Sequence, residues 1–155
     1  MTRPTIHASA VVLGTIGILV RGASAAGKSS FCDRLVEASR NKGHYAAWVA
    51  DDRVLLSSAQ GRVIAVPPPR LAGKLEVRGL GIIETAYARE AVMDLVVDLQ
   101  PLSGIERLPD TELTSEYLEN ISLPVCRLAE NRFDEGIRRL RWVTRRLFPK
   151  CPDYF

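Results

Sequence analysis

No apolar stretch in the sequence approaches the roughly 18 residues that a membrane-spanning helix requires, so we expect no membrane partner. The first residues also lack the uninterrupted apolar core of a signal peptide. The three cysteines, Cys32, Cys126 and Cys151, are far apart and form no C-x-x-C pair, which argues against a disulfide framework and a cysteine zinc site. These absences predict a protein of the reducing cytoplasm.

The chain also has little excess charge of one sign, since 21 lysines and arginines against 18 aspartates and glutamates give a net charge of +3. The charges are unevenly placed: residues 80–130 are rich in acids, and residues 132–150 are rich in basic side chains. Five of the latter are Arg138, Arg139, Arg141, Arg145 and Arg146. The modest net charge and the scarcity of aromatics among them argue against nucleic-acid binding. They are typical of a solvated helix face or of a face that docks an acidic protein.

Residues 22–29 match the phosphate-loop pattern G-x-x-x-x-G-K-[ST] at every fixed position. They read Gly22, Ala23, Ser24, Ala25, Ala26, Gly27, Lys28 and Ser29. Glycines let backbone N–H groups curl around phosphate oxygens, and the following helix N-terminus adds partial positive charge. We expect Lys28 to reach the β- and γ-phosphates, Ser29 to ligate Mg²⁺, and Ser30 to donate to a phosphate. The pattern predicts a nucleotide-phosphate site.

The sequence around the loop supports this interpretation. Residues 16–20 form a short apolar run typical of a buried strand, and residues 29–40 space Phe31, Leu35 and Val36 at helical intervals. A chance match in a loop rich in Gly, Ala and Ser is the alternative. Strand, loop and helix nevertheless come in the order that a phosphate loop requires.

At 155 residues the chain is long enough for one domain with a sizeable core, and we expect a single domain over residues 1–155. Its other segments predict a mixed sheet. They are a hairpin of strands 6–13 and 17–20, a strand at 46–50, a hairpin of 54–57 and 62–66, a glycine-rich functional loop at 71–83, a strand at 93–99, and an amphipathic basic helix at about 133–148. The fold class is therefore α/β with a phosphate loop.

Asp51 and Asp52 follow the strand at 46–50, where the chain turns and both side chains could approach one phosphate crevice. Phosphoryl transfer needs a metal and a group that accepts the proton of the nucleophile, and two carboxylates can serve both needs. A solvated turn pair is the alternative for the dipeptide. His7 taken by itself would be a partly buried structural histidine, and Arg107 a surface charge.

Four segments in order resemble the catalytic domain of HPr kinase/phosphorylase: His7-Ala8, the phosphate loop, residues 49–52, and an octapeptide that is the most specific of them. The octapeptide reads Leu75, Glu76, Val77, Arg78, Gly79, Leu80, Gly81 and Ile82. The resemblance runs from about Ile6 to Leu128 and implies a fold related to phosphoenolpyruvate carboxykinase. The N-terminal domain of the longer family members has no counterpart in this chain.

The resemblance implies an enzyme that phosphorylates a serine of the phosphocarrier HPr with ATP or pyrophosphate, and that reverses the reaction with inorganic phosphate. It further implies a hexamer. Lys28 would neutralise phosphates, Asp52 would accept the serine proton, and His7 matches the active-site histidine. Arg107, in Glu106-Arg107-Leu108, would assist at the transferring phosphate. Ser29 and Glu76 would be metal ligands, together with Asp51, which the acidic pair itself suggests as a metal ligand.

One departure concerns the reverse reaction. Family members carry a Pro-Gly-Arg-Asn loop where this chain reads Ala129-Glu130-Asn131-Arg132, so we expect a weakened or lost phosphorylase activity. Such short forms resemble those of alphaproteobacteria. Two other functions stay open from the sequence: a small-molecule kinase or nucleoside triphosphatase, and a regulator that binds nucleotide without catalysis.

Overall fold

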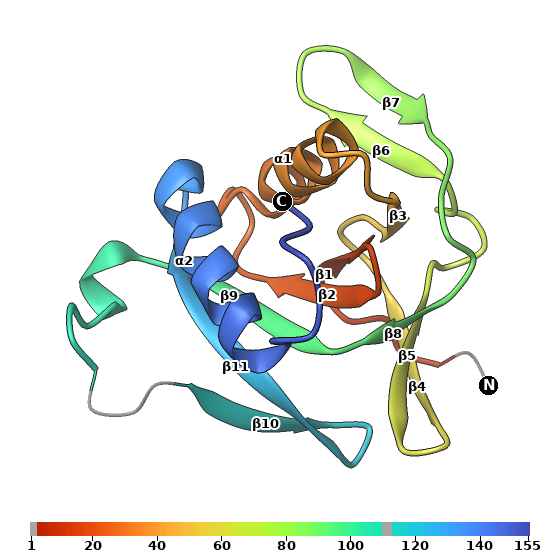
Figure 1. Ribbon diagram of the computed structural model, residues 1–155. Helices are drawn as coiled ribbons and strands as arrows, with labels where there is room; N and C mark the ends of the chain where they lie inside the picture. Colours follow the sequence, from red (N-terminus) through yellow and green to blue (C-terminus); the bar gives the residue numbers. More distant parts are fainter. Residues whose placement is uncertain (1–2, 110–112) are drawn as a thin grey trace.

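The computed structural model describes residues 3–109 and 113–155, and its centre is a six-stranded mixed sheet with two helices on one face (Figure 1). The strand order is β10-β11-β9-β2-β1-β3. The members are β1 (Ala8–Leu13), β2 (Ile16–Arg21), β3 (Ala46–Ala50), β9 (Leu95–Gln100), β10 (Thr114–Leu118) and β11 (Ile121–Ala129), and the helices are α1 (Lys28–Asn41) and α2 (Phe133–Leu147). The expected α/β class with a mixed sheet is confirmed.

Strand direction changes on the two sides of β2. β1 is antiparallel to both β2 and β3, whereas β9 is parallel to both β2 and β11. The carboxyl ends of β2, β9 and β11 and the amino end of β1 therefore share one edge of the sheet. Loops that leave this edge carry the polar residues described below, as in other open α/β sheets.

Smaller sheets complete the fold. β4 (Leu55–Ala59), β5 (Arg62–Val66) and β8 (Ala91–Met93) form a three-stranded sheet, and β6 (Lys74–Val77) pairs with β7 (Gly81–Glu84). A short 3₁₀ turn, η1 (Leu102–Gly104), follows β9. No helix among the described residues is long and apolar enough to cross a membrane.

Three of the expected segments differ in the structure, and β10 and β11 were not expected. The segment 71–83 is not a loop throughout, because β6 and β7 form a hairpin that stands out beside α1 (Figure 1). The expected strand 93–99 is divided at Asp94, whose carboxylate accepts a hydrogen bond from the Gly17 backbone N–H at 2.9 Å. The strand expected from Ile6 begins at Ala8.

The two faces of the sheet bury separate cores. The first core lies under α1 and α2, and it contains residues such as Val20, Phe31, Leu35, Val97 and Leu140. The second lies under the β4-β5-β8 sheet, and it contains residues such as Leu19, Val54, Val63, Met93 and Val96. Alternation along β2 explains this division, because successive residues of a strand point to opposite faces.

A bulge in β3 changes that alternation just before the acidic pair. Ala10 of β1 pairs with Ala50, but the next residue of β1 pairs with Trp48, so Val49 is an extra residue on β3. Val49 and Ala50 consequently both face the second core. Asp51 then faces the helices, where it contacts α1, and a bulge of this kind commonly redirects side chains beside functional sites.

Candidate active site

The phosphate loop connects β2 to α1 in a tight, left-handed turn. Gly27 has φ 93°, a backbone conformation that glycine adopts without a Cβ penalty. Lys28 is 6% exposed, and its Nζ donates to the carbonyl oxygens of Gly22 at 3.0 Å and Ala23 at 3.3 Å. A charged amine is thus held over the loop by the loop's own backbone.

The turn between β11 and α2 braces the outer side of this loop. Asn131 donates from its backbone N–H to the Ala26 carbonyl at 3.3 Å and from Nδ2 to the Ala25 carbonyl at 3.2 Å. A Cβ placed on Gly27 would lie 2.7 Å from the Phe133 ring and 2.9 Å from Asn131 Oδ1. The loop conformation therefore depends on residues more than 100 positions away in the sequence.

A second support lies where β2 enters the loop. Arg21, the residue before Gly22, donates from Nε and Nη2 to the two carboxylate oxygens of Asp98 at 2.7 and 2.9 Å, and from Nη2 to Glu116 at 2.5 Å. The hydrogen bond to Asp98 is the largest cause of the raised pKa of Arg21. One guanidinium group thereby links β2, β9 and β10.

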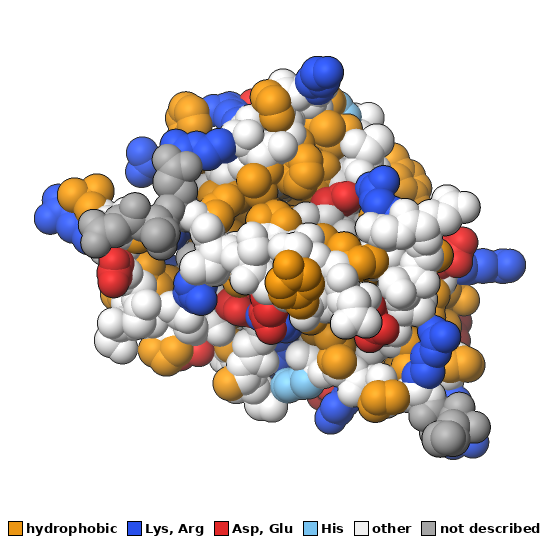
Figure 2. All heavy atoms as spheres, turned by 90° about the horizontal axis from the view of Figure 1, so that it is seen from below, with side chains coloured by type: hydrophobic (Ala, Val, Ile, Leu, Met, Phe, Trp, Pro, Cys, Tyr) orange, Lys and Arg blue, Asp and Glu red, His pale blue; other side chains and the backbone are white. Residues whose placement is uncertain are grey.

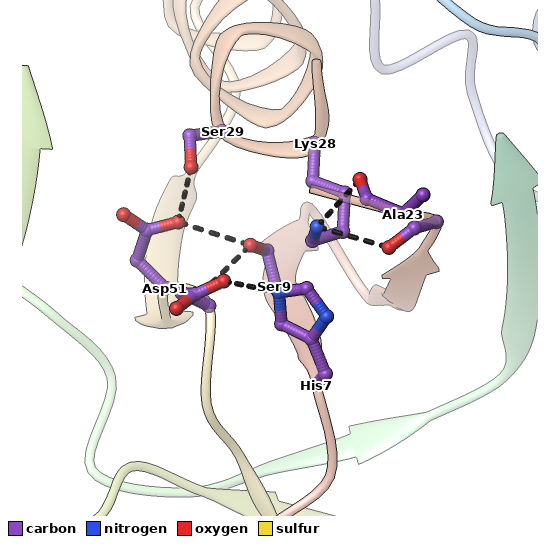
Figure 3. Close-up of polar contacts among 8 residues, drawn as sticks. His7, Ser9, Ala23, Lys28, Ser29 and Asp51 are labelled. Carbon is purple, nitrogen blue, oxygen red and sulfur yellow. Dashed lines mark hydrogen bonds and ion pairs between the residues drawn. The ribbon is translucent and has the colours of Figure 1, made fainter. Parts of the chain in front are cut away.

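Asp51 lies against the first turn of α1. Its Oδ1 accepts hydrogen bonds from Ser29 Oγ at 2.6 Å and from Ser9 Oγ at 3.0 Å (Figure 3). Within the described residues, its Oδ2 accepts no hydrogen bond. Since the proton of Ser29 is directed at Asp51, the lone pairs of that hydroxyl are available to another partner.

Asp52 points the other way, to His7. Its φ of 65° is left-handed, and its Oδ1 lies 2.5 Å from His7 Nε2. An ionised carboxylate accepts and never donates, so we assign Nε2 of the imidazole as the donor. Asp52 Oδ2 takes no hydrogen bond among the described residues, and the side chain is 60% exposed. A carboxylate oxygen therefore faces solvent beside the phosphate loop.

Figure 3 shows the resulting arrangement: contacts run from Ser29 through Asp51 and Ser9, with His7 beside them, and Lys28 is turned towards Ala23. The structure thus brings together most of the side chains that the sequence singled out. Their catalytic roles remain predictions.

Two predicted site residues lie apart from this group. Glu76 is an exposed residue of β6, and it forms no hydrogen bond or ion pair within the described part of the chain. Arg107 is exposed in the connection between β9 and β10 and likewise contacts none of these groups. Neither contributes to the site geometry as it stands.

The protein offers Mg²⁺ only a small set of oxygen donors at the phosphate loop. Among residues 3–109 and 113–155, no three His, Cys, Asp or Glu side chains lie close enough together to hold a metal ion. Mg²⁺ nevertheless typically uses one or two carboxylates together with substrate phosphates and water. Asp51 and the Ser29 hydroxyl, side by side at the phosphate loop, would be the protein's share of such a set.

Thiol chemistry does not fit this site. Burial raises the pKa of Cys32 well above its usual value, and it raises the pKa of Cys126 to about 11. A thiol becomes a nucleophile as its thiolate, so neither group is activated at neutral pH.

Comparison with known proteins shows the family to which this fold belongs. The family model described as the HPr serine kinase C-terminal domain matches residues 1–129. The chain belongs to this family. Its phosphate loop, the acidic pair and the β6–β7 hairpin all lie within the matched residues, whereas α2 lies beyond them.

Curated relatives carry the name HPr kinase/phosphorylase. The one from Cupriavidus pinatubonensis is 35% identical over 133 residues, which cover 79% of this chain and 38% of that protein. The one from Mycoplasma mycoides is 27% identical over 135 residues, 77% of this chain and 41% of that protein. The chain therefore spans about two fifths of the length of these family members.

A solved structure shows the same fold. The HPr(Ser) kinase/phosphatase from Coxiella burnetii matches with a TM-score of 0.77 at 22% sequence identity, over 96% of this chain and 93% of that chain. The sheet and helices described above are thus those of an HPr kinase domain.

Sequence reasoning missed Ser9 and Arg21 as contributors to the site. Ser9 is a small residue in an apolar strand, and Arg21 is a strand-end cation, so their types gave no signal. Asn131 was named only as part of the departure at residues 129–132, and its hydrogen bonds to the phosphate loop were not foreseen. It has φ 56°, and asparagine is enriched among non-glycine residues in that region, so its residue type was a signal for a left-handed turn before the helix.

Proposed function

We propose that this chain phosphorylates a serine hydroxyl on an HPr-type phosphocarrier protein, with ATP or pyrophosphate as the donor. One observation carries the proposal: two adjacent carboxylates diverge at the mouth of a phosphate loop, one to the loop serine and one to a histidine. Divergence gives the two carboxylates different partners, which is what metal binding and proton transfer in one reaction require.

In the proposed reaction, the serine Oγ of the carrier attacks the terminal phosphorus of the donor. The bond from that phosphorus to the bridging oxygen breaks, and ADP or phosphate leaves. Oδ2 of Asp52 takes the serine proton, while Oδ1 stays bonded to His7, which keeps the carboxylate turned towards the acceptor. Lys28 exchanges its two carbonyl partners for phosphate oxygens.

Mg²⁺, when bound, neutralises phosphate charge. Asp51 and Ser29 would hold it, and Ser29 is prepared for this because its proton is engaged by Asp51 Oδ1. The family resemblance also implies that Glu76 binds the metal and that Arg107 assists at the transferring phosphate. Both assignments would require these side chains to approach the loop in the complex.

Exposure of the base favours a protein acceptor over a small metabolite. Small-molecule substrates are usually enclosed in concave sites, whereas Asp52 is 60% exposed. A serine on the surface of another protein reaches such a base without being enclosed. This observation ranks a protein kinase above a small-molecule kinase or nucleoside triphosphatase.

A nucleic-acid partner receives no support from the face drawn in Figure 2. Lys and Arg side chains there are scattered among acidic and hydrophobic ones and form no continuous basic patch. The hexameric assembly remains a prediction of the family resemblance, and the cytoplasmic location remains a prediction from the cysteine pattern and the lack of an apolar signal-peptide core.

We further propose that phosphorylase activity is weakened. Asn131 and its neighbours occupy the place of the family's Pro-Gly-Arg-Asn loop, and here the asparagine is engaged with the phosphate loop. The proposed forward reaction uses the groups around Asp52 and Lys28, and this departure does not change them.

The test is transfer of labelled phosphate from ATP to a purified HPr-type carrier in the presence of Mg²⁺, followed by excess inorganic phosphate. Serine labelling supports the kinase, and persistence of the label supports the loss of the reverse reaction. Asp52→Asn should abolish most transfer while ATP affinity stays within a few fold. Absence of labelling contradicts the proposal and favours a small-molecule kinase or a non-catalytic regulator as the function. Equal losses of ATP binding and turnover in Asp52→Asn also contradict the proposal.

A further inference from the structure

Ser9 is a completely buried hydroxyl in a strand whose other residues are Ala, Val and Leu. A buried hydroxyl is destabilising unless it is hydrogen-bonded. Its partners here are both in the acidic pair: Oγ donates to Asp51 Oδ1 at 3.0 Å and accepts from the Asp52 backbone N–H at 3.1 Å. No other side chain among the described residues contacts both members of the pair by hydrogen bonds.

The direction of these bonds is fixed by chemistry. A backbone N–H only donates, and an ionised carboxylate only accepts, so the proton of Ser9 must point to Asp51 while a lone pair faces Asp52. Hydrogen bonds in such a chain polarise one another. Ser9 therefore strengthens the acceptor geometry of Asp51 and the backbone turn at Asp52 together.

The turn needs this support. Asp52 has φ 65°, in the left-handed region that non-glycine residues adopt only when the surrounding structure holds them there. The N–H that Ser9 holds belongs to this residue. If the turn relaxed, the carboxylate of Asp52 would no longer be directed to His7, and Asp51 would lose one of its two hydroxyl donors.

We propose that Ser9 is a positioning residue that separates the functions of the two carboxylates. It holds Asp51 towards Ser29, where Mg²⁺ would bind, and it holds the backbone of Asp52 so that its side chain faces His7 and the acceptor. The proposal rests on the phosphoryl transfer proposed above. Ser9 itself touches neither substrate nor metal.

The chain offers a matched control in Ser39, on α1. It is also 0% exposed, but its Oγ has no hydrogen-bond partner among the described residues. Ser39→Ala removes the same atom from an equally buried position without affecting the acidic pair. A comparison of the two alanine variants therefore separates positioning from the general effect of losing a buried hydroxyl.

Three measurements on the full chain test the proposal. The first is amide hydrogen exchange at Asp52 by NMR, which Ser9→Ala should accelerate by about tenfold or more, as expected for a lost hydrogen bond. The second is the gain in affinity for a fluorescent ATP analogue on adding Mg²⁺. The third is kcat and KM for carrier phosphorylation.

Ser9→Ala should reduce the Mg²⁺-dependent affinity gain and kcat by about 10- to 100-fold, the range seen when groups that orient metal ligands are removed. Affinity without Mg²⁺ should stay within about twofold, because Lys28 and the loop amides are unchanged. Ser39→Ala should match the natural chain in all three measurements. Ser9→Thr, which keeps the hydroxyl, should restore at least part of each loss. If Ser9→Ala or Ser9→Thr fails to fold, Ser9→Cys takes the place of that Ser9 variant, because it is a near-isosteric change with a weak donor.

Unchanged Asp52 exchange, or kcat and Mg²⁺-dependent affinity within twofold of the natural chain, would overturn the role of Ser9, as would similar losses in Ser39→Ala. Absence of any Mg²⁺-dependent gain in the natural chain would overturn it too. If the natural chain binds Mg-ATP but labels no carrier, the kinase proposal fails by itself, and the exchange and binding measurements still decide the role of Ser9.

Discussion

Replacing Gly27 by alanine should damage the phosphate loop in two separable ways. With φ 93°, the backbone is in the region where an L side chain costs about 1–2 kcal/mol. The new Cβ would also lie 2.7 Å from the Phe133 ring and 2.9 Å from Asn131 Oδ1. Overpacking of this kind typically costs a further ~1–3 kcal/mol. We expect Gly27→Ala to lower the free energy of unfolding by about 2–5 kcal/mol.

Gly43→Ala is the matched control. Gly43 follows α1 with φ 82°, and nothing lies within 4 Å of the position its Cβ would take. It therefore carries the backbone cost of about 1–2 kcal/mol without the collision. The difference between the two variants measures the contact with the β11–α2 turn.

Urea unfolding followed by tryptophan fluorescence gives both free energies, and a common slope with denaturant shows that the comparison is valid. Adding Phe133→Leu to Gly27→Ala should recover part of the loss, because a smaller, flexible side chain makes room for the methyl group. Equal destabilisation by Gly27→Ala and Gly43→Ala would refute the reasoning. The turn that contains Asn131 would then not press on the phosphate loop.

Three further changes have defined outcomes. Lys28→Ala removes the cation over the loop and should weaken ATP binding by about 10- to 100-fold, the size of a charge-assisted hydrogen bond, in calorimetry against a Lys150→Ala control; unchanged affinity contradicts its role. Tyr154→Ala should cost about 3–5 kcal/mol in urea unfolding because the ring is buried over the 14–15 turn, whereas Tyr154→Phe, which loses only the hydrogen bond to Thr15, should cost about 1 kcal/mol. The hydrogen bonds from Arg145 lower the pKa of Asp153, so its stabilising effect is present above about pH 4 and is lost as the pH falls further. The stability difference between the natural chain and Asp153→Asn should therefore shrink between pH 7 and pH 3, and a constant difference would rule this linkage out.

Local sequence signals predicted the elements whose residue pattern is itself local. The helix after the phosphate loop was expected at 29–40 and spans Lys28–Asn41, because its apolar side chains recur at helical intervals facing one core. The basic helix expected at about 133–148 spans Phe133–Leu147 for the same reason. The first hairpin was visible because its apolar strands surround a short turn at Gly14.

Elements that depend on distant pairing were not visible. β11 contains Pro124, which argues against a strand, yet that proline pairs with β10 before the strand joins β9 at Val125. The glycines Gly79 and Gly81 suggested a loop, but Gly79 lies in the turn of the β6–β7 hairpin and Gly81 is the first residue of β7. In each case the deciding partner lies elsewhere in the chain, and residue type alone does not reveal it.

The candidate site divides in the same way. Residue patterns indicated the phosphate loop and the acidic pair, because side-chain type and spacing are enough to recognise both. The part played by Ser9 depends on the pairing of β1 with β3, which brings residues 42 and 43 positions apart into contact. Burial of a serine does not by itself indicate a role in the site, because Ser39 is equally buried and its Oγ contacts no member of the acidic pair.

The bulge in β3 sets a register requirement on this strand that folding by itself does not impose. If β3 kept its length but paired regularly with β1, Val49 would pair with Ala10 and Ala50 with Ser9, and the alternation of faces would carry Asp51 to the side of the sheet away from Ser29. A change that abolished the bulge without shortening the strand would thus leave every polar residue of the site in the chain, yet separate the carboxylate from the phosphate loop. The place of the bulge between Trp48 and Asp51 is therefore as much a part of the candidate site as the aspartate itself.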